Sequence, residues 1–250
     1  MSKADVLGVF NQLAGFYDSL PFEWLLVGHC LLVSSWFTRL KDRFLLCYWV
    51  GLLAAFGGGV VSALLLQDPA KAPIALFADN KVGVIWTTCW WLITFFPYNL
   101  VERTHQLLPV RLVTKASLNI LRAGVMASRI DLVVAKFPGV VAAPLVVGTI
   151  AASGGKFTID GVLAVCGELT GAPGEAVVPG FAFRSGFLGS VIYYGAVYVL
   201  GSLSRAEAKA LIITLFVAHG VFADIVGQPL DYTSNCHKPP LNHTAVVCGD

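Results

Sequence analysis

A stripe of basic side chains runs along one apolar stretch of the sequence. Its members are Arg111, Lys115, Arg122, Arg129 and Lys136. The last four are seven residues apart, and the first lies four residues before the second. A seven-residue step along an α-helix drifts by only about 20°, so all five side chains would share one face. The apolar residues between them are numerous enough to predict a membrane-spanning helix.

Arg122 is the member of this stripe whose position demands an explanation. It lies more than ten residues from either end of the stretch, and a charge at that depth costs at least about 2.5–3.5 kcal/mol in lipid. We expect it to face protein, trapped water or an anionic lipid headgroup, or to pair with a carboxylate of another helix. The segment's own acid, Asp131, is nine residues on and cannot be an i,i+4 partner. Lys115 and Lys136 are close enough to the ends to extend to the membrane surface, and Arg129 is intermediate.

The composition is that of an all-α integral membrane protein. Of 250 residues, 56% are hydrophobic and 13% charged, whereas soluble domains carry about 25% charged residues. A net charge of +2 without a basic tract does not indicate a nucleic-acid partner. Four of the six cysteines lie in or beside apolar segments, so no disulfide framework is implied. No signal peptide is expected at the N-terminus.

Hydropathy and turn residues predict seven transmembrane helices followed by a polar tail. The predicted spans are about 22–38, 44–66, 82–101, 107–135, 139–155, 181–203 and 207–227. We expect the fifth span to close at the glycines near 155, and residues 156–180 to form the longest loop. Loop Lys and Arg residues slightly favour a cytosolic C-terminus, while a glycosylation sequon at Asn242 would favour the opposite side.

The sequence pattern indicates an internal repeat, with one glycine cluster in each of its two copies. Gly57, Gly58 and Gly59 lie in the second span, and Gly154 and Gly155 in the fifth. Two units of three spans each must be inverted relative to one another, and interrupted helices at matching places in such repeats usually flank a permeation or substrate path. We therefore predict kinked or broken, pore-lining helices at these glycines. The alternative is that the glycines merely allow close helix packing.

The predicted organisation has four parts. Residues 1–106 form the first three-helix repeat, and residues 107–203 the second, inverted one. Residues 204–230 form the seventh helix, and residues 231–250 the polar tail.

Several motifs, taken in order, resemble the trimeric intracellular cation (TRIC) channels of endoplasmic and sarcoplasmic reticulum membranes. They are FGGGVVS at 56–62, WWL at 90–92, FFPYNL at 95–100, LPVRLV at 108–113 and FP at 137–138, with an aromatic–basic–glycine pattern at Phe181, Arg184 and Gly189. Each motif alone is weak, but their order and spacing together are fairly specific.

The resemblance implies a homotrimeric channel with one pore per protomer. It would pass K⁺ and Na⁺ through an intracellular store membrane and supply counter-current when Ca²⁺ leaves. Arg122, Lys115, Arg129 and Arg184 would sense voltage, line the pore or hold a lipid headgroup. No covalent cofactor or metal is expected, and an anionic phosphoinositide is the ligand that the resemblance suggests.

The chain departs from the family at one position of interest. The fourth helix of the family usually reads Lys-Glu-x-x-Arg, where this sequence has Leu118, Asn119 and then Arg122. In animal members the Lys–Arg pair is implicated in voltage response and phosphoinositide binding, and only its Arg is kept here.

The main alternative function is a secondary transporter of a small solute, because inverted repeats with broken helices serve alternating access equally well. Enzyme activity is not expected, because the sequence lacks the common hydrolase, dinucleotide-binding and metalloprotease motifs.

Overall fold

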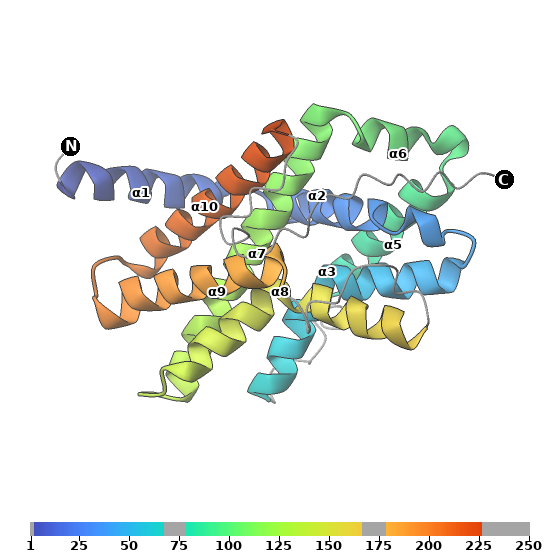
Figure 1. The fold of residues 1–250 in the computed structure, drawn as a ribbon. Helices are drawn as coiled ribbons and strands as arrows, with labels where there is room; N and C mark the ends of the chain where they lie inside the picture. The colour runs from blue at the N-terminus through green and yellow to red at the C-terminus, as the bar shows by residue number, and fades with distance from the viewer. Residues whose placement is uncertain (1–2, 68–78, 167–178, 227–250) are drawn as a thin grey trace, which may run out of the picture.

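The computed structural model describes residues 3–67, 79–166 and 179–226. Within these ranges the chain is helical and contains no β-strand (Figure 1). The elements are α1 (Lys3–Ser19), α2 (Phe22–Ser35), η1 (Thr38–Leu40), α3 (Phe44–Leu66), α5 (Asn80–Phe95), η2 (Pro97–Asn99), α6 (Leu100–His105), α7 (Leu108–Lys136), α8 (Ala142–Val165), α9 (Phe181–Tyr194), η3 (Gly195–Val199) and α10 (Arg205–Val226). The sequon at Asn242 and the predicted tail at 231–250 lie outside the described residues.

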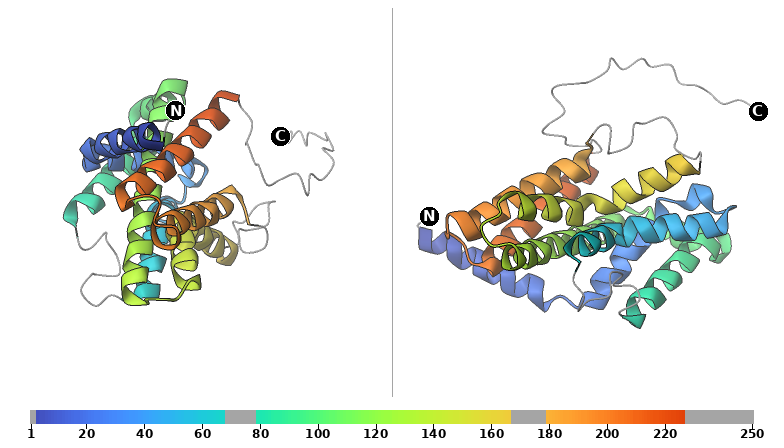
Figure 2. Two further views of the ribbon diagram at one scale, coloured as in Figure 1. Left: turned by 90° about the vertical axis from the view of Figure 1, so that its left-hand side faces the viewer. Right: turned by 90° about the horizontal axis from the view of Figure 1, so that it is seen from below.

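The basic helix α7 occupies the centre of the arrangement. It packs against α2, α8 and α10, and the views in Figures 1 and 2 place it between the early and the late helices of the chain. Leu118 and Leu121 contact an apolar core built mainly by α2, α3 and α5. Ala123 and Met126 belong to a second core, shared with α9 and α10. One helix therefore joins two cores.

The two glycine-bearing helices, α3 and α8, form the most extensive helix pair of the fold. A methyl group on Gly154 would lie 2.8 Å from Cα of Gly58, and one on Gly58 would lie 2.6 Å from the carbonyl oxygen of Ala151. The two backbones thus meet at van der Waals distance, which only glycine permits.

Of the two alternatives predicted at these glycines, the break is wrong and the kink is what the structure shows. Both helices are continuous through the clusters, although each changes direction part-way along its length (Figure 1). Glycine relaxes the local packing enough for a helix to bend. Because the neighbouring helix supports the backbone at the same point, the hydrogen-bonded ladder persists through the bend.

The predicted end of the fifth span near residue 155 is also wrong, because α8 runs on to Val165. Ile159 and Leu163 are buried in the core of α2, α3 and α5, so the second half of α8 has an apolar face to bury. Lys156 and Asp160 form an i,i+4 ion pair within this half, which supports the helix further. Residues 156–165 of the predicted loop at 156–180 are therefore helical.

The third predicted span is divided rather than continuous. Helix α5 ends at Phe95, and α5 meets the Pro97–His105 segment at an angle of 91°. Pro97 cannot continue the helix, and Tyr98 and Asn99 adopt left-handed φ angles of 58° and 53°. The chain therefore turns sharply between α5 and the start of α7.

Three helices among the described residues, α3, α8 and α10, are long and apolar enough to cross a membrane. The bent pair of α5 with the Pro97–His105 segment would make a fourth, and α2 is a shorter apolar helix. Helix α7 extends from 108 to 136, close to the predicted 107–135. Helix α7 is not among these apolar helices, because the basic stripe makes it too rich in charged residues.

Candidate functional site

A cavity of about 310 Å³ lies where the bent helices α3 and α8 meet the basic helix α7. The residues that line it include Gly58 and Gly59 of α3, Gly155 of α8, and Arg122 and Arg129 of α7. The matching places of the two glycine clusters, noted in the sequence, thus correspond to one site in space. Gly57 and Gly154 lie in the α3–α8 contact rather than in the wall of this cavity.

Basic side chains line this cavity. Lys156 of α8 joins Arg122 and Arg129 there, with its charge paired with Asp160, and no acidic residue is among the described residues of the wall. His29 of α2 also lines the cavity, and its Nε2 donates to the carbonyl of Ala55 at 3.1 Å. Since a carbonyl only accepts, this contact places the imidazole proton on Nε2.

Arg122 is held by backbone oxygens of two helices. Its Nε donates to the carbonyl of Ala152 in α8 at 2.6 Å, and one terminal nitrogen donates to the carbonyl of Ala182 in α9. The same nitrogen lies 2.8 Å from Oγ of Ser185. Because Ser185 also donates to the carbonyl of Phe181 at 2.7 Å, its hydroxyl oxygen is free to accept from Arg122. Of the environments that the sequence left open for Arg122, the structure shows protein contacts.

Arg129, one heptad further along α7, is directed at the glycine cluster of α3. Its terminal nitrogen lies 3.5 Å from the carbonyl oxygen of Gly59, at the long limit for a hydrogen bond. The stripe therefore connects α7 with α8 and α9 at Arg122, and with α3 at Arg129.

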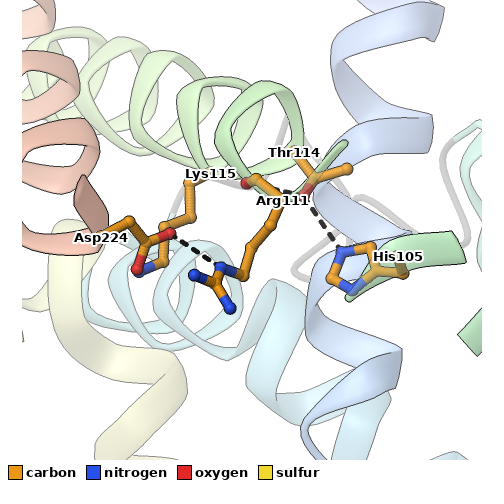
Figure 3. Close-up of polar contacts among 5 residues, drawn as sticks. All are labelled: His105, Arg111, Thr114, Lys115 and Asp224. Carbon is orange, nitrogen blue, oxygen red and sulfur yellow. Dashed lines mark hydrogen bonds and ion pairs between the residues drawn. The ribbon is translucent and has the colours of Figure 1, made fainter. Parts of the chain in front are cut away.

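Lys115 does not line the cavity. It forms an ion pair with Asp224 of α10, and Arg111 Nε lies 3.3 Å from the other carboxylate oxygen of the same aspartate (Figure 3). His105 lies beside this cluster, with its Nε2 3.1 Å from Oγ1 of Thr114. The predicted extension of Lys115 to the membrane surface gives way to a protein partner, Asp224.

Lys136 and Arg184 also lie apart from the cavity. Lys136 donates to the carbonyl of Leu66 at the end of α3, where a cation interacts favourably with the helix dipole. Arg184 Nε lies 3.4 Å from the carbonyl of Gly180, at the start of its own helix. The structure thus brings together only Arg122 and Arg129 of the four predicted basic site residues.

Three partners of the basic helix were not predicted from the sequence. The ring of Phe216 in α10 lies against the Arg122 guanidinium, 4.7 Å from Cζ to the ring centroid. Asp131 accepts hydrogen bonds from Tyr193 at 3.0 Å and from Tyr198 at 2.7 Å. No periodicity in the sequence links α7 with residues so far along the chain.

A second cavity, of about 540 Å³, lies against α8 on another side. Its wall is almost wholly apolar, with contributions from Val61, Val146, Phe157, Phe183 and Phe187. It lacks charged groups, so it is less suited than the first cavity to hydrated ions.

The family model described as TRIC channel matches residues 37–226, which are most of the chain. The matched range includes every residue that α3, α7 and α8 contribute to the cavity wall. The chain belongs to the TRIC channel family. Within this TRIC chain the match also covers α5, α9 and α10.

Similar sequences include trimeric intracellular cation channels of vertebrates. The type B channel of Danio rerio is 27% identical over 149 residues, which are 60% of the present chain and 50% of that protein. The type B channel of Homo sapiens is 34% identical over 91 residues, 36% of this chain and 26% of that protein. The TRIC chain thus spans half or less of the length of these relatives.

Solved structures share the fold of this TRIC chain at low sequence identity. One of them comes from a study of the structural basis for activity of TRIC counter-ion channels in calcium release, and it has a TM-score of 0.77 at 17% sequence identity. The match covers 87% of this chain and 99% of the solved chain. A trimeric intracellular cation channel from C. elegans without Ca²⁺ has a TM-score of 0.73 at 15% identity, covering 88% and 97%. The predicted membership of the TRIC family is confirmed.

Proposed function

We propose that this TRIC protein is a monovalent cation channel, passing K⁺ and Na⁺ across an intracellular store membrane and supplying counter-current during Ca²⁺ release. The observation that carries the proposal is the cavity at the meeting point of α3, α7 and α8. Gly58 and Gly59 on one helix and Gly155 on the other bring bare backbone to its wall. Backbone exposed at membrane depth is tolerated where it lines a water-filled cavity.

The proposed ion path follows the glycine-bearing faces of α3 and α8. The bends of α3 and α8 at matching places support the inverted three-helix repeats expected from the sequence, and seven crossings remain part of the proposal. Backbone carbonyls near a bend can replace part of the hydration shell of an alkali cation.

A basic cavity wall in a cation path is consistent with a closed gate. Arg122 places a positive charge in the wall beside Ala152, and this charge opposes cation entry in a medium of low dielectric constant. Moving one charge across the membrane field is worth about 2.3 kcal/mol per 100 mV. We therefore assign Arg122 to gating, with Arg129 as the next basic residue along the same path.

Homotrimeric assembly and a lipid ligand complete the proposal. Relatives are named trimeric intracellular cation channels, which supports three copies of this chain. Native mass spectrometry in mild detergent would give the mass of three copies, whereas the mass of a monomer or dimer would contradict trimeric assembly.

An anionic phosphoinositide remains the proposed ligand of the exposed basic groups. The C-terminus is proposed to lie on the cytosolic side of the membrane.

The experiment that tests this function is single-channel recording of the purified protein in planar bilayers under a KCl gradient. We expect unitary current steps and a reversal potential near that of K⁺, with Na⁺ able to replace it. A reversal potential near that of Cl⁻ would contradict a cation channel. Slow, saturable uptake without unitary steps would instead favour a secondary transporter.

A further inference from the structure

The Arg122 seat is the set of groups that surrounds its guanidinium: the Ala152 and Ala182 carbonyls, the Ser185 hydroxyl and the Phe216 ring. We propose that Phe216 is a positioning residue whose cation–π contact holds Arg122 in this seat and so sets the voltage at which the channel opens. This proposal rests on the gating role of Arg122 proposed above.

The partners in the seat are of two kinds, because oxygens bind the N–H groups of the guanidinium while its Cζ lies over the ring of Phe216. A guanidinium is planar, and its N–H groups all lie in that plane. The three oxygens take protons from Nε and one terminal nitrogen of Arg122. Hydrogen bonds leave the π face of the group unused, and an aromatic ring is the side chain that binds it best.

Phe216 can reach Arg122 because α9 presents a face of small residues. Ala182, Ser185 and Gly189 lie at positions i, i+3 and i+7 of α9 and therefore share one side of the helix. A methyl group on Gly189 would lie 2.9 Å from Cζ of Phe216 and 3.2 Å from Sδ of Met126. The absence of a side chain at Gly189 thus provides the space that the ring occupies.

The ring is also shielded from solvent. Phe216 is 8% exposed and belongs to the core formed by α7, α9 and α10. A cation–π contact gains strength when both groups are desolvated. Since Arg122 must leave this environment to move through the field, the contact stabilises the closed state in which the guanidinium lies in the cavity wall.

The test varies the charge distribution of the ring while keeping its shape. Phe216 is replaced in the full-length channel by phenylalanine carrying one, two or three fluorine atoms, which weakens the negative face of the ring step by step. Conductance–voltage curves are recorded in planar bilayers for each. The matched control makes the same replacements at Phe222, which lies on the same helix and is 53% exposed.

We expect the Phe216 series to move the half-activation voltage progressively toward easier opening. Complete loss of a desolvated cation–π contact corresponds to roughly a 30-fold change in the open-to-closed ratio at a fixed voltage. The Phe222 series should leave the curves in place. A purely structural role of the ring would give no such gradation, because fluorination scarcely alters its volume.

Arg122→Gln is recorded in parallel so that the two proposals fail separately. If Arg122→Gln shifts the curve while the Phe216 series does not, or shifts it equally for one and three fluorines, the role of Phe216 is overturned and gating by Arg122 stands. An unchanged curve for Arg122→Gln overturns the gating role, and with it the function of the seat.

Discussion

Lys115 of α7 forms an ion pair with Asp224 of α10, although the two residues lie 109 positions apart in the chain. The aspartate side chain is only 13% exposed, and Arg111 approaches its second oxygen at 3.3 Å. A carboxylate in the last turn of a helix is unfavourable for the helix dipole. The two cations offset that effect and join the start of α7 to the end of α10.

Asp224→Asn should destabilise the protein. The substitution leaves Arg111 and Lys115 close together without a carboxylate, and breaking a half-buried pair costs on the order of 1–2 kcal/mol, between exposed and fully buried cases. The thermal unfolding midpoint in detergent measures this loss. The control is Asp18→Asn, because Asp18 pairs with Lys209 at the surface with its side chain 57% exposed. Equal losses in the two variants would contradict the importance of the buried pair.

Two glycine substitutions should separate packing from permeation. Gly154→Leu should prevent α3 and α8 from meeting, because even a methyl group would lie 2.8 Å from Cα of Gly58. Loss of folded protein in size-exclusion chromatography is the expected result.

Gly59→Leu should fold, since a methyl group at Gly59 meets no atom within 4 Å, but the leucine side chain would enter the cavity.

Single-channel conductance is therefore the property that Gly59→Leu should lower. Gly8→Leu is a suitable control, because a methyl group there also meets no atom within 4 Å and the residue lies in α1, away from the cavity. Wild-type conductance in a well-folded Gly59→Leu channel would place the ion path elsewhere.

Tyr198→Phe should weaken the attachment of η3 to α7. The chain adopts a π-helical turn over Gly195–Val199, and the wider turn brings Tyr198 toward the side of the helix that carries Tyr193. Both hydroxyls then reach Asp131, at 2.7 Å and 3.0 Å. Losing a hydrogen bond to a charged group costs about 1.5 kcal/mol or more.

The thermal unfolding midpoint again gives the measurement for Tyr198. Tyr194→Phe is the matched control, because the Tyr194 ring stacks on Tyr198 at 5.8 Å and removing its hydroxyl leaves the hydrogen bonds of Asp131 intact. The same midpoint for Tyr198→Phe as for wild type would mean that Asp131 is satisfied without it.

Features that depend on local periodicity were predictable from the sequence. The seven-residue spacing of basic side chains and the apolar residues between them gave α7 almost to its ends, 107–135 against the observed 108–136. The central position of Arg122 predicted that its charge is shielded from lipid, because the cost of an exposed charge in lipid depends mainly on depth. The choice among protein, trapped water and a lipid headgroup came from the structure, which shows protein contacts.

Features that depend on tertiary contact were not predictable in the same way. Gly154 and Gly155 signal a weak point in an isolated helix, but the packing of α3 against them keeps α8 helical to Val165. The carbonyls of Ala152 and Ala182 that hold Arg122 belong to residues whose side chains carry no polar signal. Backbone acceptors have no signature in the sequence, so this part of the site requires the folded structure.

The central claim is that Arg122 is the working charge of the basic helix, and a pair of conductance–voltage curves tests it most directly. Arg122→Gln and Lys115→Gln are compared in planar bilayers at equal thermal stability. Because Arg122 lies in the cavity wall and Lys115 is paired with Asp224, we expect the larger shift of half-activation voltage from Arg122→Gln. A larger shift from Lys115→Gln, or no shift from either variant, would contradict the claim.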